Sequence, residues 1–261
     1  MNDAARLLTD HQRAVADRVL DEESVRRHHL VIALSGAHAY GFASPDSDLD
    51  LKSIHIAPTE QLLGLTPPRD DNDRMEVIEG VEIDYTSNEL GGALRGILKG
   101  NGNYLERVLG ECALRAAPQL DELRPIAAAS LSRRLLHHYR GFATSQLHEW
   151  EKTGGRSAKK ALYVLRTTLT GTHALRTGTI VTDVTRLLDD YGFAHARELI
   201  AVKQSAERAS LADDQSERWR RELARAFEVL DESARTSPLP DDPPNTPDVA
   251  AWLVETRRRM F

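Results

Sequence analysis

The chain has 261 residues, of which 41% are hydrophobic, and a formal net charge of −6. This apolar content suffices for a packed core and excludes global disorder, while no apolar run approaches the roughly 20 residues that a membrane-spanning helix needs. The single cysteine excludes an internal disulfide and a zinc site built from several cysteines. An N-terminus with acidic residues and no apolar secretory segment predicts a cytoplasmic protein without membrane contact.

The charge is unevenly distributed along the chain. Residues 1–130 carry 13 basic and 22 acidic side chains, whereas residues 131–181 carry 9 basic and 2 acidic ones. An acidic part joined to a basic part suits a site in which carboxylates hold a metal ion and cations hold polyphosphate. A uniformly basic nucleic-acid-binding protein would not show this asymmetry.

Helical and strand patterns both occur in the first half of the chain. Apolar residues at near-helical spacing predict helices, and period-two alternation or a short β-branched run predicts strands. The predicted elements are a helix over residues 3–28, strands over 29–34, 48–57 (irregular at Ser53) and 77–87, a polar loop over 66–74, a helix from an N-cap at Ser87 or Asn88 to Leu98, and a helix over 104–114.

The second half of the chain has no strand pattern. From a boundary near Arg124 and Pro125 to Ala234 the spacing of apolar residues is helical, and a Pro/Asp-rich linker over 236–248 precedes a terminal helix. Strands gathered in one half and helices in the other predict an α+β fold, with domains over 1–125 and 126–261.

Three aspartates alternate in the stretch LSGAHAYGFASPDSDLDL, residues 34–51. An EF-hand reading of Asp46, Asp48 and Asp50 fails, because its glycine and bidentate glutamate positions hold Leu51 and Ala57. A structural reading stays open, in which Asp46 caps the Ser-Pro-Asp bend and the other two are solvated strand residues.

A catalytic metal site is the third reading. On an extended strand, Asp48 and Asp50 would project to the same face, where paired carboxylates hold Mg²⁺ for phosphoryl transfer. Such a site needs a third acid from a neighbouring strand, for which Asp84 is the candidate and Glu82 the spare. It also needs a turn whose N–H groups face phosphate, here Ser35-Gly36.

These motifs resemble the DNA polymerase β-like nucleotidyltransferase superfamily, and in particular its RNA-repair-associated branch. The resemblance covers about residues 30–106. It is carried by SGAHAYG (35–41), PDSDLDL (45–51), IDYTSNEL (83–90) and KGNGNYLE (99–106), with a weaker likeness in KKALYVLR (159–166).

The resemblance implies a small mixed-sheet nucleotidyltransferase core followed by a helical domain. It implies transfer of a nucleoside monophosphate from an NTP, expected to be ATP, to the hydroxyl of an acceptor; an RNA end is implied, and a protein or small molecule stays open. Asp48, Asp50 and Asp84 would be the catalytic and metal-binding residues, with Mg²⁺ as cofactor and Mn²⁺ as a substitute. Ser35, Gly36, Ala37 and His38 would bind the nucleotide.

One position departs from the family pattern. The residue after the turn glycine is usually serine, whose hydroxyl can touch phosphate, and here it is Ala37. A lost hydrogen bond of this kind is worth on the order of 1–3 kcal/mol. A degenerate fold that binds nucleotide or a partner without catalysis therefore stays open.

A basic stretch lies in the second half, in GGRSAKKALYVLRTTLTGTHALR (154–176). Helical spacing would place Arg156, Lys159, Tyr163 and Arg166 on one stripe, and we expect the last three together with Lys160 to bind nucleotide; a solvated helix face is the alternative. The spacing of Arg166 and His173 also fits HEPN-type ribonucleases, which is a rival function.

Overall fold

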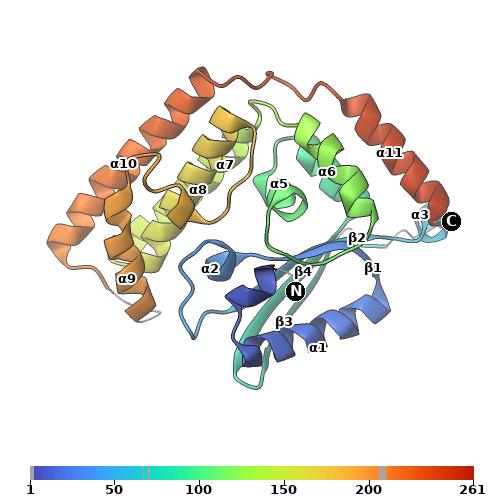
Figure 1. Ribbon diagram of the computed structural model, residues 1–261, viewed down its shortest axis with the longest axis horizontal. Coiled ribbons are helices and arrows are strands. Elements are labelled where there is room, and N and C mark those ends of the chain that lie inside the picture. The colour runs from blue at the N-terminus through green and yellow to red at the C-terminus, as the bar shows by residue number, and fades with distance from the viewer. Residues whose placement is uncertain (1–2, 67, 70, 206–209) are drawn as a thin grey trace. The chain divides into compact units, whose positions relative to one another are not determined.

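A computed structural model of the protein describes residues 3–66, 68–69, 71–205 and 210–261. They form two compact units (Figure 1). The first comprises the chain up to Ala39, Asp48–Ser130 and Pro243–Phe261, and the second comprises Tyr40–Ser47 and Leu131–Asp242. The boundary predicted near residue 125 thus lies within the first unit, and the terminal helix, which the sequence assigned to the helical domain, belongs to the first unit as well.

The first unit contains a sheet and the helices around it. Its elements are η1 (Asp3–Leu7), α1 (Asp10–Arg26), β1 (His28–Leu34), α2 (Gly36–Ala39), β2 (Leu49–Ile56), α3 (Thr59–Leu63), β3 (Asp71–Ile78), β4 (Val81–Glu89), α4 (Leu90–Leu98), α5 (Gly102–Leu109), β5 (Ala113–Ala116), α6 (Gln119–Ala129) and α11 (Thr246–Arg259).

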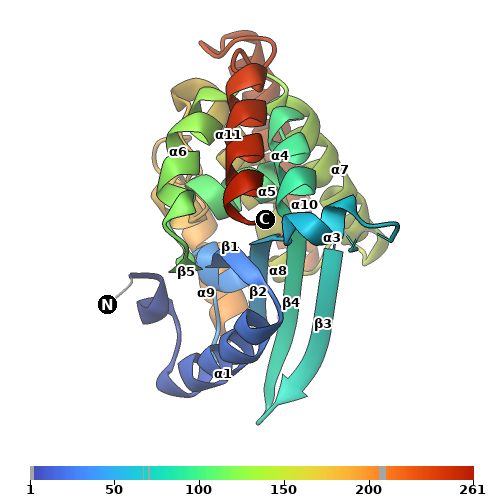
Figure 2. The same ribbon diagram turned by 90° about the vertical axis from the view of Figure 1, so that its right-hand side faces the viewer.

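In the described part of the chain the sheet has five strands, in the order β3-β4-β2-β1-β5, with β3 at one edge (Figure 2). The β2–β4 pair is parallel and the other pairs are antiparallel, so the sheet is mixed. Helix α1 buries Val15 and Val19, and Arg74 of β3 binds Glu22 of α1 at 2.7 Å. The predicted α+β class and mixed sheet are confirmed.

Two strands of this sheet form a hairpin that the sequence did not predict. The polar loop expected over 66–74 ends where β3 begins, at Asp71. The single strand expected over 77–87 instead contains the end of β3, the turn and most of β4. Residues 67 and 70 of that loop lie outside the described residues. Glu79 and Gly80 both have positive φ, 50° and 83°, as two-residue hairpin turns require. The polar residues at the start of β3 concealed an edge strand, since such a strand need not alternate apolar and polar residues.

Three predicted element bounds are also wrong. Strand β4 continues to Glu89, because Ser87 and Asn88 pair with β2, so α4 begins at Leu90. The helix expected over 104–114 ends at Leu109 and is followed by β5, which is too short to show a period. Thr9 starts a capping box that separates η1 from α1.

The predicted irregularity of the second strand lies elsewhere. Strand β2 pairs regularly with β1 through Ser53, and the register shift falls between His29 and Val31 of β1. The inserted residue is therefore in the first strand rather than in the second.

The second unit is helical. Its elements are α7 (Leu135–Lys152), α8 (Ala158–Thr177), η2 (Val184–Arg186), η3 (Ala194–Ala196), α9 (Arg197–Ser205) and α10 (Asp213–Arg235). Helices α7, α8 and α10 pack side by side (Figure 1), and α8 is buried along most of its length. Helices are found in this region and at the C-terminal end, as predicted, but they do not run without a break to Ala234: Gly178, in the left-handed conformation, ends α8, and residues 178–193 contain only the short η2. The segment after Arg235 ends at Asn245 rather than at Asp248, because α11 begins at Thr246. Residues 206–209 lie outside the described residues.

Among the described residues, no helix combines the length and the apolar character that crossing a membrane would require.

Candidate functional site

Two of the predicted site aspartates are direct neighbours across parallel strands. Asp50 of β2 is the register partner of Asp84 of β4, and Leu49 is the partner of Ile83. Register partners point to the same face, and neighbouring strands lie about 4.8 Å apart, so the two carboxylates emerge side by side. Leu49 and Ile83 are buried on the opposite face. The structure thus brings together the strand pair that the sequence singled out.

The glycine turn packs directly against Asp50. Gly36 has a φ of +61°, and a Cβ on this residue would lie 1.8 Å from Asp50 Oδ2. The Ser35 N–H donates a hydrogen bond to the Asp50 carbonyl oxygen at 2.9 Å. Ala37 and His38 follow in the one-turn helix α2 and are buried. Only a residue without a side chain allows the turn to approach the carboxylate so closely.

Asp48 lies just before the strand rather than within it. Strand β2 begins at Leu49, and Asp48 is half-buried in the preceding segment, so its sharing a face with Asp50 stays a prediction. Asp46 is exposed in the turn, and its role in capping the bend stays a prediction. The spare candidate Glu82 lies on the same face of β4 as Asp84 and is exposed.

A lysine that the sequence reasoning missed occupies this face. Lys52 Nζ lies 2.7 Å from Asp84 Oδ1, and it donates to the Asp84 carbonyl oxygen and to Thr86 Oγ1, each at 3.3 Å. The strand pattern could have revealed it, because Lys52 follows Asp50 by two residues and therefore shares its face.

The donor set of this face suits a hard cation, because Mg²⁺ prefers carboxylate oxygens. Asp50 and Asp84 supply such oxygens from adjacent strands. Within the described ranges, however, there is no group of three or more His, Cys, Asp or Glu side chains that could hold a metal ion in the observed arrangement. The ammonium of Lys52 holds the third carboxylate instead.

The basic stretch of the second unit differs in part from the predicted stripe. Arg156 precedes α8, whose N-cap is Ser157, and it pairs with Asp213 at 2.5 Å, so it is not part of a helical stripe. Lys159 and Lys160 lie in the first turn of α8 and are half-buried, and Lys160 Nζ donates to the Glu149 carbonyl oxygen at 3.1 Å.

Arg166 and Tyr163 pack against the segment that follows the glycine turn in the chain. The Arg166 guanidinium lies 3.6 Å from the centre of the Tyr40 ring, and Arg166 is only 2% exposed. The Tyr163 ring meets Tyr40 and Phe42 edge-on, at 5.8 and 5.5 Å between centroids. Their expected contact with nucleotide stays a prediction.

The end of the same segment is anchored by a buried lysine that sequence reasoning also missed. Lys203 of α9 is fully buried, and its Nζ donates to Ser44 Oγ at 2.5 Å and to Ser47 Oγ at 2.8 Å. The Ser47 N–H closes the turn onto the Ser44 carbonyl oxygen at 3.0 Å. The second unit therefore holds residues 40–47 at both ends, directly before Asp48.

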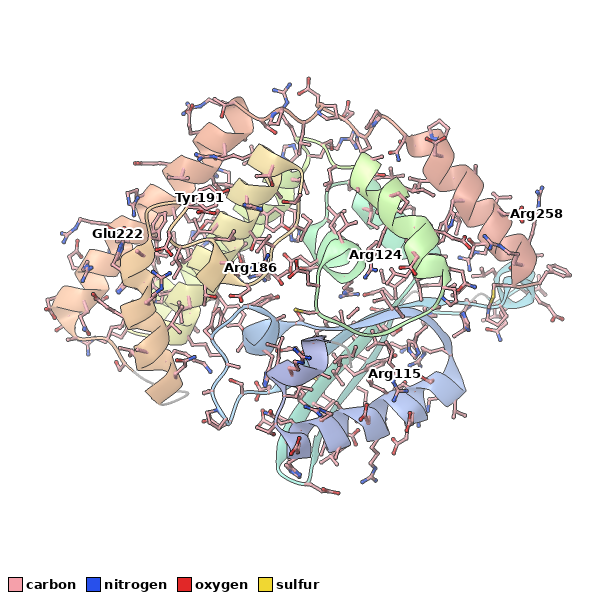
Figure 3. All side chains as sticks on the ribbon, viewed as in Figure 1. Arg115, Arg124, Arg186, Tyr191, Glu222 and Arg258 are labelled. Atoms are coloured by element: carbon pink, nitrogen blue, oxygen red, sulfur yellow. The ribbon has the colours of Figure 1, made fainter. Side chains whose placement is uncertain are left out.

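The two residues of the rival ribonuclease pattern have different partners. His173 Nδ1 contacts the Tyr191 hydroxyl at 3.0 Å (Tyr191 is labelled in Figure 3), and Nε2 contacts Thr179 Oγ1 at 3.0 Å. Burial lowers the pKa of His173. Arg166 instead stacks on Tyr40. These contacts give the ribonuclease hypothesis no support.

Comparison with known proteins shows what this chain is similar to. Residues 11–255 match the model of RlaP, the RNA repair pathway DNA polymerase beta family. An uncharacterized protein of Methanocaldococcus jannaschii, MJ0002, is 28% identical over 240 residues, which cover 89% of this chain and 94% of the relative. The crystal structure of a nucleotidyltransferase-like protein from Exiguobacterium sibiricum 255-15 aligns with 93% of this chain and 78% of that chain, at 12% identity and a TM-score of 0.32, too low for structural inference.

Proposed function

The chain belongs to the RNA repair pathway DNA polymerase beta family, and from that premise we propose that it is a Mg²⁺-dependent nucleotidyltransferase. It moves a nucleoside monophosphate from an NTP, with ATP as the proposed donor, to an acceptor hydroxyl. The observation that carries this proposal is the register pairing of Asp50 with Asp84 beside the Gly36 turn. Carboxylates on adjacent strands next to a glycine turn are the parts that this chemistry needs.

Each carboxylate has its own task in the proposed reaction. Asp50, pressed against Gly36, would hold Mg²⁺ together with Asp48, and Asp84 would complete the set. The metal, when bound, supplies Lewis acidity at the α-phosphate and neutralises charge on the departing pyrophosphate. Asp84, whose side chain is 39% exposed, receives the proton of the attacking hydroxyl.

The polyphosphate is bound by the turn and by cations. The Ser35 side chain and the backbone N–H groups of Gly36 and Ala37 bind the terminal phosphates, with His38 supporting the turn. Lys159 and Lys160 of α8 are the cations expected to contact nucleotide, and that expectation stays a prediction. No hydroxyl is present at Ala37, so nucleotide affinity rests more heavily on the backbone and on these cations.

The family description makes an RNA end the first acceptor to test. The full chain is incubated with Mg²⁺ and each α-labelled NTP, separately with total RNA and total protein. We expect labelled RNA and pyrophosphate release, with ATP the preferred donor. If protein became labelled and RNA did not, RNA would be excluded as the acceptor, and the proposed transferase reaction would still hold.

Two variants test the site itself. Asp50→Asn should reduce pyrophosphate release at least about 100-fold, because a neutral amide is a poorer metal ligand. Glu82→Gln removes a charge from the same face of β4 and serves as the control, with an expected change of less than about threefold. Full activity in Asp50→Asn would contradict the proposal.

Ala37 is the one observation that favours a second candidate, a fold that binds nucleotide without turnover. Equilibrium dialysis with radiolabelled ATP separates the two functions. Saturable binding with no pyrophosphate release in any acceptor pool would establish the non-catalytic function and exclude the transferase.

A further inference from the structure

The ammonium of Lys52 is fully coordinated by groups of strand β4. An ammonium has three N–H donors, and Lys52 Nζ meets three oxygens: Asp84 Oδ1 at 2.7 Å, and the Asp84 carbonyl oxygen and Thr86 Oγ1 at 3.3 Å each. The Lys52 side chain is 18% exposed, against 39% for that of Asp84. Lys52 thus covers one side of Asp84, on the face that also carries Asp50.

This arrangement places a positive charge where the proposed chemistry needs a metal ion. Asp84 Oδ1 cannot accept the Lys52 ammonium at 2.7 Å and also ligate a divalent cation without bringing two positive charges into contact. The absence of a three-acid group among the described residues agrees with this competition. The ion pair is partly exposed, so stability gives little reason for it.

We propose that Lys52 is the resident counter-ion of Asp84, and that it closes this carboxylate to divalent cations until a nucleotide phosphate draws the ammonium away. The inference rests on the proposed function. Lys52 acts through Asp84 and is therefore a positioning residue. In one arrangement Lys52 pairs with Asp84; in the other it pairs with phosphate oxygen, and Asp84 is released for the metal.

Phosphate is the ligand that fits this exchange. The Lys52 ammonium needs an anionic oxygen to replace the carboxylate it leaves, and phosphate oxygens supply it without loss of charge pairing. The same face holds Asp50, which contacts the Gly36 turn. Nucleotide and metal should then strengthen each other's binding, because linkage between two ligands is reciprocal.

The test measures Mn²⁺ binding to the full chain by electron paramagnetic resonance, with and without an α,β-methylene NTP analogue that cannot be cleaved at the donor bond. Without nucleotide, Lys52→Met should bind Mn²⁺ at least about tenfold more tightly than the natural protein. The analogue should tighten Mn²⁺ binding in the natural protein and have a much smaller effect in Lys52→Met.

Three further variants make the test specific. Lys99→Met removes the exposed lysine that caps α4 in the same unit, and should behave like the natural protein. Lys52→Arg keeps the charge and should restore weak binding without nucleotide. Lys52→Gln, which can still donate to Asp84, replaces Lys52→Met if that variant does not fold.

The outcomes separate this inference from the proposed function. Lys52→Met and the natural protein could bind Mn²⁺ equally tightly without nucleotide, while both still bind Mn²⁺ and the analogue when the two are added together. That result would overturn the role of Lys52 alone. Failure of every variant to bind Mn²⁺, with the analogue present, would overturn the proposed metal-dependent function and the inference with it.

Discussion

The Cα of Gly36 and the carboxylate of Asp50 are in direct contact, so that a Cβ on residue 36 would stand 1.8 Å from Asp50 Oδ2 and 2.7 Å from its Cγ. The turn therefore packs directly against the strand carboxylate, with a hydrogen bond from Ser35 N–H to the Asp50 carbonyl oxygen beside it. This contact gives the glycine a chemical role beyond its backbone conformation.

Gly36→Ala should abolish activity and lower stability. The methyl group would displace the Asp50 carboxylate, and the φ of +61° adds about 1–2 kcal/mol of strain for a residue with a side chain. We expect at least about a 100-fold loss of pyrophosphate release, measured with a melting curve on the same sample.

Gly80→Ala is the matched control for that change. Gly80 also has a positive φ, +83°, but a Cβ there meets nothing within 4 Å. The Gly80→Ala variant should lose about 1–2 kcal/mol of stability to backbone strain, as Gly36→Ala does, but it should keep its activity. Equal activity loss in both variants would contradict a specific role for the Gly36–Asp50 contact.

Ala37→Ser should improve nucleotide binding. A hydroxyl at this position could donate to a terminal phosphate, and one such hydrogen bond is worth about 1 kcal/mol, or roughly fivefold in Kd. Because Ala37 is buried, the free protein should become slightly less stable. Ala39→Ser, at an equally buried position of the same short helix, is the control; calorimetric ATP titration showing no difference between the two would count against the phosphate cradle.

His29 should make the stability of the first unit depend on pH. Burial, with a contribution from Arg27, lowers the pKa of His29 from 6.5 to about 3, and its Nε2 contacts the Tyr85 hydroxyl at 2.7 Å. Between these values the unfolded chain binds a proton that the folded protein does not. The free energy of unfolding should therefore fall as the pH drops through this window, with a limiting slope of about 1.4 kcal/mol per pH unit.

His29→Gln tests that origin. It removes the titrating group, so the slope between pH 6.5 and 4 should decrease even though the variant is less stable at pH 7. His28→Gln, at the exposed neighbouring position, should leave the slope unchanged. Urea unfolding at a series of pH values measures both, and identical slopes in the natural protein and His29→Gln would refute the assignment.

Arg257 should anchor the terminal helix α11 to the rest of the first unit. Its guanidinium pairs with Glu89 and donates to the Ala57 carbonyl oxygen at 3.1 Å, and Glu89 also caps α4 through the Gly91 N–H. Arg257→Met would leave the buried carboxylate of Glu89 without this partner, a loss of roughly 3 kcal/mol. Chemical denaturation of the full chain measures the change.

Arg258→Met is the control one residue further along α11. Arg258 is 75% exposed and pairs with Glu255 at 3.7 Å (Arg258 is labelled in Figure 3). Its loss should change stability by no more than about 0.5 kcal/mol. Equal destabilisation by both variants would show that helix propensity, and not the Glu89 pair, explains the effect.

The sequence predicted the parts of the site that depend on local pattern. Period-two alternation placed Asp50 and Asp84 in strands, and their pairing across β2 and β4 followed the family motif. The same alternation could have placed Lys52 beside Asp50, but not its bond to Asp84, because a strand pattern does not specify which strands are neighbours. The short strand β5 and the polar start of β3 left no period to detect.

The chain's own sequence therefore determined its α+β class, its family and the carboxylates of the candidate site, because periodicity and motif spacing are local properties. Only the tertiary structure decided three further features: Lys52 holds Asp84, Lys203 anchors the turn from Ser44 to Ser47, and Arg166 is covered by Tyr40. In each case the partners are separated by many residues. Such contacts depend on how strands and helices pack, and no local pattern encodes that packing.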